Sequence, residues 1–331
     1  MLKYILKRLG LAVIILLGVS VIIYALVRAM PVDFVENKIN QMNQGGATIS
    51  QDVIDAMYQM YGITDRTFLG VLSGYWSWLT ALCRFDLGKS FVYGDDVLKV
   101  IVEHMGVSFL VSFIAIIFEY LIAIPLGITA ATHQYSVRDY VVTVLVMIGL
   151  SLPSFFFGRV LQNVFSMGLG WFPVSGLTDA TQHFTGLAAV GDYLSHLALP
   201  LFTMVILSIG GTMRYTRTNM LEVLNSDYIR TARAKGLKES KVIYKHAFRN
   251  TMIPIVTILA GVLPTLFSGA MITEQVFDLP GIGNVAYKAM MQGDIPFIMG
   301  YNMFLAILSV LGVLISDLMY AVVDPRVKLA R

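Results

Sequence analysis

Long apolar segments separated by polar ones dominate the hydrophobic pattern of this chain. Apolar segments with few charges occupy positions 9–30, 105–131, 140–167, 195–216, 253–273 and 299–323. Each reaches the length of about 20 residues that an α-helix needs to cross the hydrocarbon core of a bilayer. Buried helices of soluble proteins can be as apolar, but they are usually shorter. The pattern therefore predicts an all-α polytopic membrane protein with six transmembrane helices.

Charge predicts how these spans are oriented. The chain has 24 Lys and Arg residues, and they gather at both termini and between positions 214 and 249. Segment 168–194 contains no Lys or Arg, and segment 274–298 contains only Lys288. Since cytoplasmic loops are enriched in Lys and Arg, both termini and the basic segment are expected in the cytoplasm. The first span follows a basic start, is too long for a signal-peptide core and lacks a cleavage site, so we expect it to be uncleaved.

The polar segment between the first two spans, positions 31–104, is then expected to be extracytoplasmic. Apolar residues at helical spacing predict a surface helix over positions 50–61. Trp76 and Trp78 form an aromatic pair of the kind that favours a membrane interface.

The basic stretch at positions 227–254 predicts two short helices joined at Gly236. Ser226 or Asp227 can cap the first helix, and Gly236 suits the left-handed turn that ends it. The second helix, over positions 239–251, would gather four side chains on one side: Val242, Ile243, His246 and Ala247. A hairpin this short cannot build a core of its own, so we expect it to dock onto a partner.

Two motifs in this stretch, ARAKGL at 232–237 and HAFRN at 246–250, resemble the "EAA" loop of ABC importer permeases. The form is most similar to that of the peptide/nickel subfamily. In this family the loop is a coupling helix that sits in a groove of the cytoplasmic ATPase. The resemblance implies an ATPase-coupling role for Asp227, Ala232, Ala234, Gly236, His246, Arg249 and Asn250. Charge alone would fit an ordinary basic cytoplasmic loop equally well, whereas the spacing favours the family.

A second run, EQVFDLPGIG at 274–283 followed by DIP at 294–296, resembles the signature of the same family. It predicts a gate element in which Pro280 and Gly281 make a tight turn and Gly283 permits a close backbone approach. A role for Glu274 in the translocation path is the alternative. Similarity to the family extends over nearly the whole chain and is weakest at positions 33–44.

The resemblance implies a type I ABC importer permease fold in a bacterial inner membrane. Its parts would be a cytoplasmic tip and first helix (1–30), an extracytoplasmic segment (31–104), a transmembrane core (105–323) containing the coupling loop (217–252), and a cytoplasmic tail (324–331). The implied partners are a second homologous permease, two ATPase subunits, an extracytoplasmic substrate-binding protein and membrane lipid.

Catalytic chemistry is not expected in this chain. Its five histidines do not lie at metal-ligand spacing, and Cys83 is its only cysteine, so no intramolecular disulfide can form. No phosphate-binding loop is present, and any ATP hydrolysis must come from a partner. We therefore expect no enzyme activity, no metal and no cofactor, and the interleaving of the basic charges with spans argues against nucleic-acid binding.

Two charged residues inside the spans are further candidates for the translocation path. Glu119 lies in the middle of the second span and Arg159 in the third. Such charges are costly in lipid and usually face a bundle or a cavity. Three hypotheses remain open for Arg159: it snorkels to the interface, it pairs with Glu119, or it attracts the carboxylate of a peptide.

The sequence thus predicts the permease subunit of an ATP-driven importer for oligopeptides or dipeptides. A nickel or glutathione permease of the same family is one alternative. An ion-coupled secondary transporter is another, since intramembrane carboxylates can relay protons.

Overall fold

The computed structural model describes residues 2–29, 68–179, 181–182, 184–252, 255 and 262–323. Over these residues it is helical, with one isolated β-bridge between Lys89 and Asp96. The helices are α1 (Leu2–Arg28), α4 (Phe68–Leu82), α5 (Val97–Thr132), α6 (Val137–Ser151), α7 (Ser154–Leu161), α8 (Leu187–Leu224), α9 (Asp227–Ala234), α10 (Glu239–Lys241), α12 (Leu263–Ser268), α13 (Met271–Val276), α14 (Ile282–Gln292) and α15 (Ile295–Val323). Two π-helical segments, η1 (Gln162–Gly168) and η2 (Val242–Phe248), continue α7 and α10.

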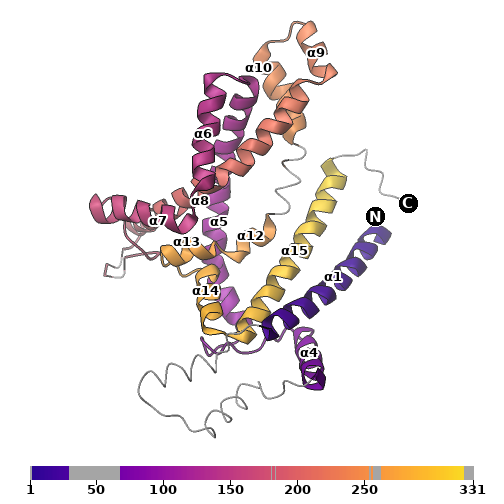
Figure 1. Ribbon diagram of the computed structural model, residues 1–331, viewed down its shortest axis with the longest axis vertical. Helices are drawn as coiled ribbons and strands as arrows, with labels where there is room; N and C mark the ends of the chain where they lie inside the picture. The colour runs from indigo at the N-terminus through magenta and orange to yellow at the C-terminus, as the bar shows by residue number, and fades with distance from the viewer. Residues whose placement is uncertain are drawn as a thin grey trace.

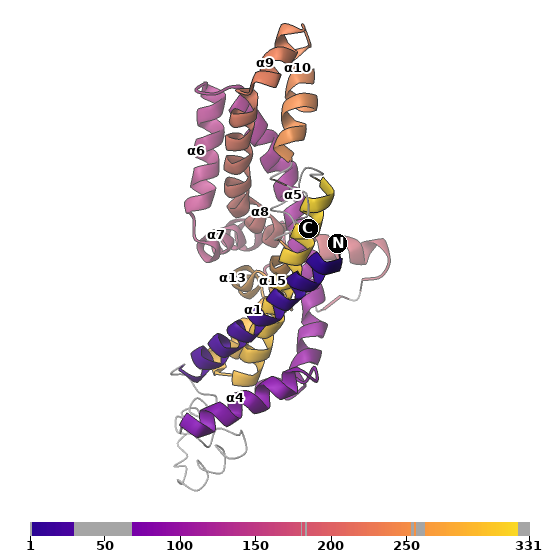
Figure 2. The same ribbon diagram turned by 90° about the vertical axis from the view of Figure 1, so that its right-hand side faces the viewer.

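The long helices form an elongated bundle (Figure 1). Helices α5, α6 and α8 run side by side, with α9 and α10 at one end of the molecule. Helix α15 packs against α1, and α4 lies at the opposite end (Figure 2). A bidentate ion pair joins α6 to α8, because Arg217 donates to both carboxylate oxygens of Asp139 at 2.9 and 2.8 Å.

Four helices are long and apolar enough to cross a membrane, and a fifth span is possible if the bent pair of α6 with α7 and η1 is counted as one. Helices α5 and α8 contain 36 and 38 residues. At about 1.5 Å per residue each exceeds 50 Å, far more than the roughly 30 Å hydrocarbon core. Both helices are longer than the spans expected at 105–131 and 195–216, and their ends therefore project beyond the bilayer.

The third span is not the single helix expected over positions 140–167. It bends by 99° between Ser151 and Ser154. Pro153 lacks an N–H and disfavours helical backbone at the residue before it, and Leu152 is accordingly extended at φ −83° and ψ 131°. Proline thus ends α6 and starts α7 in a new direction.

Most of the first half of the fifth expected span, 253–273, falls outside the described residues, so a sixth transmembrane helix remains a prediction. Its described part contains α12 and then α13, separated by a break at Gly269, where φ is +71°. Side chains satisfy the backbone groups at the break. Tyr301 donates its hydroxyl to the Ser268 carbonyl at 2.5 Å, and Glu274 accepts from the Ala270 N–H at 3.1 Å. Such compensation is what a break at membrane depth requires.

Candidate coupling and gating sites

The segment formed by α9, α10 and η2, residues 227–248, is called the basic hairpin below. Its apolar side chains are already buried within this chain. They are Ile229, Ala232, Val242 and Ala247, which pack against the ends of α5 and α8. Met220 of α8 belongs to the same cluster and is fully buried. The hairpin is therefore mounted rigidly on two long helices.

Gly236 forms the turn of the basic hairpin. Its φ of +74° lies in the left-handed region, and a Cβ added there would meet no atom within 4 Å. Arg233 and Glu239 bridge the turn with an ion pair at 2.7 Å. The hydrogen bond from Arg233 lowers the pKa of Glu239 below its usual value, and the same bond raises the pKa of Arg233.

Asn250 fastens the second half of the hairpin to the first. Its Nδ2 donates at 3.0 Å to the Tyr228 hydroxyl of α9 and at 3.0 Å to the His246 carbonyl. Asp227 forms an exposed pair with Arg230 at 3.6 Å. The expected cap is absent, because the Ser226 hydroxyl donates backwards to the Val223 carbonyl at 2.6 Å.

The outward side of the hairpin is basic and solvent-exposed. The side chains of Ile243 and His246 are half-buried. Ala234 and Gly236 are exposed. The exposed cationic residues on the hairpin and directly after it are Arg230, Arg233, Lys235, Lys238, Lys241, Lys245 and Arg249. One face thus binds the bundle while the other presents positive charge.

The segment formed by α13 and α14, residues 271–292, is called the carboxylate hairpin below. At its centre lies Glu274, which is only 1% exposed. Oε1 accepts from the Ser108 hydroxyl of α5 at 2.7 Å and from the Ala270 N–H. Oε2 accepts from the Asn284 N–H at 3.0 Å, at the start of α14. Ser108 itself accepts from the Ile282 N–H at 2.8 Å, so the contacts form one connected network.

Gly281 and Gly283 leave room for the Glu274 carboxylate because they have no side chain. A Cβ on Gly281 would overlap Glu274 Oε2 and lie 2.5 Å from the Ser108 hydroxyl. A Cβ on Gly283 would lie 2.8 Å from the same oxygen. Neither glycine has a positive φ, and the left-handed residue of the turn is Asp278 at +47°. Pro280 is exposed at the tip.

A second buried carboxylate follows α14. Asp294 has no exposed surface, and its Oδ2 accepts from the Ser90 hydroxyl at 2.5 Å and from the Val92 N–H at 3.0 Å. Its Oδ1 accepts from the Phe297 N–H at 3.2 Å, which caps the start of α15. Glu274 and Asp294 thus hold both ends of α14.

The three candidates for the translocation path lie in separate environments. Glu119 accepts a hydrogen bond from Thr212, which joins α5 to α8. Arg159 is exposed and donates to Gln162 at 3.1 Å, and no ion pair between Arg159 and Glu119 is found among the described residues. The carboxylate oxygens of Glu274 face protein donors. The structure does not bring these three residues together.

Sequence reasoning missed the partners of these groups. Ser108 is one of two serines in an apolar span and carries no local signal. Gln162 is 1% exposed and its Nε2 donates to the carbonyls of Val174 at 2.7 Å and Val276 at 3.0 Å. It thereby ties η1 to the carboxylate hairpin. The sequence offers one signal for Gln162: an amide without hydrogen-bond partners in a membrane span would cost free energy, so partners had to be expected.

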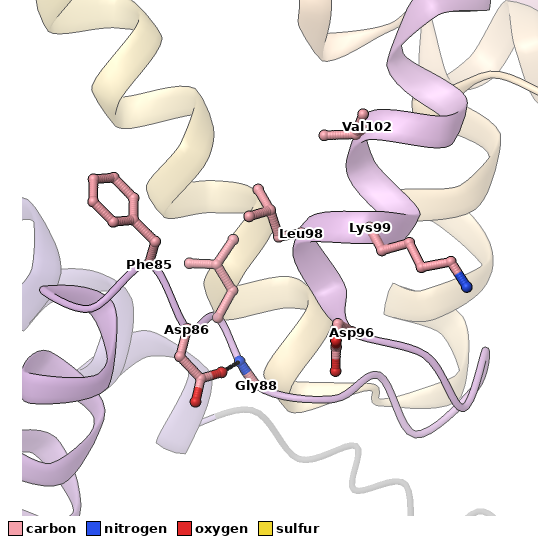
Figure 3. A pocket seen from close by; sticks show the side chains of 8 residues that line it. Phe85, Asp86, Gly88, Asp96, Leu98, Lys99 and Val102 are labelled. Carbon is pink, nitrogen blue, oxygen red and sulfur yellow. Dashed lines mark hydrogen bonds between the residues drawn. The ribbon is translucent and has the colours of Figure 1, made fainter.

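A cavity of about 540 Å³ opens where the chain enters α5 (Figure 3). It is lined by Phe85, Asp86, Leu87, Gly88, Asp96, Leu98, Lys99 and Val102. Over the described residues, no group of three or more His, Cys, Asp or Glu side chains could hold a metal ion.

The chain matches the family model "Binding-protein-dependent transport system inner membrane component" over residues 123–329. That range includes the basic hairpin and the carboxylate hairpin. The chain belongs to this family. It is a permease, a multi-pass component of the bacterial inner membrane.

Relatives match the permease over most or nearly all of its length. The oligopeptide transport system permease protein AppB of Bacillus subtilis (strain 168) is 36% identical, over 99% of this chain and 100% of the relative. A putative peptide permease protein of Brucella ovis is 34% identical, over 99% of each chain. The peptidoglycan transport system permease protein YejB of Agrobacterium fabrum is 31% identical, over 87% of this chain and 79% of the relative.

A solved structure supports the fold. The inward-facing MetNI methionine ABC transporter contains a chain that matches with a TM-score of 0.53 at 16% identity, covering 69% of the permease and 97% of that chain. The permease therefore has the type I importer fold.

Proposed function

We propose that this permease forms, with a second homologous permease, the translocation pathway of an ATP-driven importer for oligopeptides or dipeptides. The observation that carries the proposal is the 36% identity to an oligopeptide permease over 99% of the chain. In this proposal an extracytoplasmic binding protein delivers the peptide and two ATPase subunits supply the energy. The permease itself changes no covalent bond.

The basic hairpin supports the coupling role. A rigid element with its apolar face buried on α5 and α8 can transmit a displacement to both helices. Its cationic face offers a contact surface for an acidic groove of an ATPase. Asn250 and the Gly236 turn set the angle between its two halves, so we assign them to positioning and the exposed Arg249 to docking.

The proposed topology places both termini and the basic hairpin in the cytoplasm. It also places α4, the cavity beside Phe85 and the sole cysteine outside. Cys83 is exposed and outside the long helices. A membrane-impermeant thiol reagent should therefore label Cys83 in intact cells, at a yield that lysis does not raise. Labelling that appears only after lysis would invert the topology.

The transport proposal is tested with the purified complex in proteoliposomes. We expect ATP hydrolysis to be stimulated by the binding protein loaded with a short peptide, and peptide uptake to survive a protonophore. Uptake that needs no ATP and collapses with the protonophore would identify an ion-coupled transporter instead. Stimulation by a nickel chelate or glutathione, with none by peptides, would keep the importer and change its cargo.

A further inference from the structure

Helix α4 is uncharged along its whole length, although it is not a transmembrane helix. Its 15 residues have the sequence FLGVLSGYWSWLTAL. At about 1.5 Å per residue the helix is roughly 22 Å long, short of the roughly 30 Å hydrocarbon core. The apolar surface of a helix this short must be shielded from water by something other than a full crossing of the bilayer.

One side of α4 is fixed to the bundle. The rings of Tyr75 and Trp78 lie 5.5 and 6.0 Å from the ring of Tyr24 in α1. The Tyr75 hydroxyl is 2.9 Å from the hydroxyl of Ser20, and the same cluster includes Ile298 of α15. Tyr24 lies near the end of α1 and Ile298 near the start of α15. Helix α4 is therefore held at the level where the apolar span 7–27 ends and the apolar span 295–315 begins (Figure 2).

The opposite side of α4 is exposed and divided in two. Leu72 is 55% exposed and Trp76 is 66% exposed, and they are neighbours one turn apart. Next to them around the helix lie Ser73, Ser77 and Thr80, which are also exposed. The hydroxyls of Ser73 and Thr80 donate to carbonyls of their own helix. The exposed surface thus has an apolar half and a hydroxyl half, and these two hydroxyls need no protein acceptor.

Phe85 provides an independent observation three residues after α4. Its φ is +60° and its side chain is 84% exposed. An L-residue pays about 1–2 kcal/mol for this conformation, and here the ring gains little packing in return. In Figure 3 the ring points in the direction in which α5 runs away from the loop, whereas Asp86 and Asp96 point the opposite way. The loop therefore also separates an apolar side from an acidic one.

We propose that α4 and Phe85 form an interfacial anchor that binds phospholipid. Leu72, Trp76 and Phe85 lie at the boundary between acyl chains and headgroups, and the hydroxyl and acidic side chains lie among headgroups and water. Trp side chains are enriched at this depth of the bilayer. Helix α1, which carries α4, exposes Ile22 and Leu26 towards the same end, so its apolar surface continues to this level. Under the topology proposed above, the leaflet is the outer one.

Photo-crosslinking in the assembled transporter tests the anchor. p-Benzoylphenylalanine replaces Trp76, Phe85 or Trp78, one at a time, and bacterial membranes are irradiated before purification and mass spectrometry. Each replacement keeps an aromatic ring, and the amount of assembled transporter recovered is measured for each variant. Trp78 is the matched control, since it lies on the same helix but faces Tyr24.

Phospholipid adducts at positions 76 and 85, several-fold above the yield at position 78, are the expected result. An adduct to another protein chain at position 76 or 85 would identify a protein docking surface and overturn the proposal. So would a phospholipid yield at position 76 no higher than at position 78. None of these outcomes depends on the cargo or on ATP.

Discussion

The basic hairpin and the carboxylate hairpin are both short pairs of helical segments set between longer helices, yet they are held by opposite means. Apolar side chains seat the basic hairpin on α5 and α8, and the space around Gly236 is empty. A buried carboxylate holds the carboxylate hairpin, and the space around Gly281 is full. Glycine is needed for its backbone conformation in the first and for its small size in the second. The two hairpins should therefore fail differently when they are altered.

The largest effect is expected for Gly281→Ala. The added methyl would overlap Glu274 Oε2 and crowd Ser108. Overpacking of this kind costs about 1–3 kcal/mol, and a displaced buried carboxylate adds to the cost. We expect the purified permease to melt at a clearly lower temperature and to accumulate less in the membrane. Gly106→Ala, at a helical glycine on α5 with nothing within 4 Å, is the control. Equal stability of both variants would contradict the packing argument.

The second largest effect is expected for Glu274→Gln, which tests whether the charge or the shape of the side chain stabilises the carboxylate hairpin. Both carboxylate oxygens accept from donors, so an amide must turn its own N–H groups towards one donor set. An unsatisfied buried donor costs about 1–3 kcal/mol. Thermal unfolding should show a loss comparable to that of Ser108→Ala, which removes one donor to the carboxylate and leaves the buried Ile282 N–H without its acceptor. A Gln variant as stable as the parent would show that the hairpin does not depend on a negative charge at this position.

Gly236→Ala is expected to have a smaller effect on stability but a sharp effect on coupling. The strain at φ +74° is about 1 kcal/mol, and relieving it changes the angle between α9 and η2. Stimulated ATP hydrolysis should fall while membrane abundance stays the same. Gly170→Ala is the matched control, since that glycine has φ +65° and empty surroundings but lies far from the basic hairpin in sequence. A similar loss in both variants would show that strain alone, not coupling, is measured.

The smallest effect is expected for the Arg233–Glu239 pair. Exposed pairs contribute about 0.2–1 kcal/mol, so Glu239→Gln should scarcely change thermal unfolding near neutral pH. The pKa of Glu239 is lowered in the folded protein. The contribution of the pair is therefore present above the ordinary pKa of a glutamate and is lost as pH falls through the lowered value. The stability difference between parent and variant should vanish in acid, and a difference that grew in acid would contradict this assignment.

The sequence was sufficient for the parts of the molecule that depend on local pattern. Apolar length predicted four helices that are long enough to cross a membrane, and Gly236 predicted a left-handed turn that the structure confirms. One span was expected over 140–167 and the bend at Pro153 was not predicted, because a proline in a span can be tolerated or can redirect the helix, and neighbouring helices decide which.

The partners of Glu274 could not be predicted at all. Ser108 is 166 residues away in the chain, and one hydroxyl in an apolar span carries no sign of its acceptor. The sequence around Gly281 and Gly283 indicated that another group packs closely against the backbone there, but it did not identify that group. The group is the carboxylate of Glu274, which belongs to the same stretch of sequence and is brought there by the path of the backbone.

The long sequence separations in the carboxylate network have a consequence for biosynthesis. Ser108 and Ser90 meet their acceptors 166 and 204 residues later, so both hydroxyls leave the ribosome well before Glu274 and Asp294 exist. Until then the first half of α5 and the loop before it have no permanent partners at these positions. A partly synthesised chain of this kind exposes surface that is buried only in the complete protein. A nascent permease arrested before residue 274 should therefore be a good substrate for membrane quality-control proteases, and release past residue 294 should end that vulnerability.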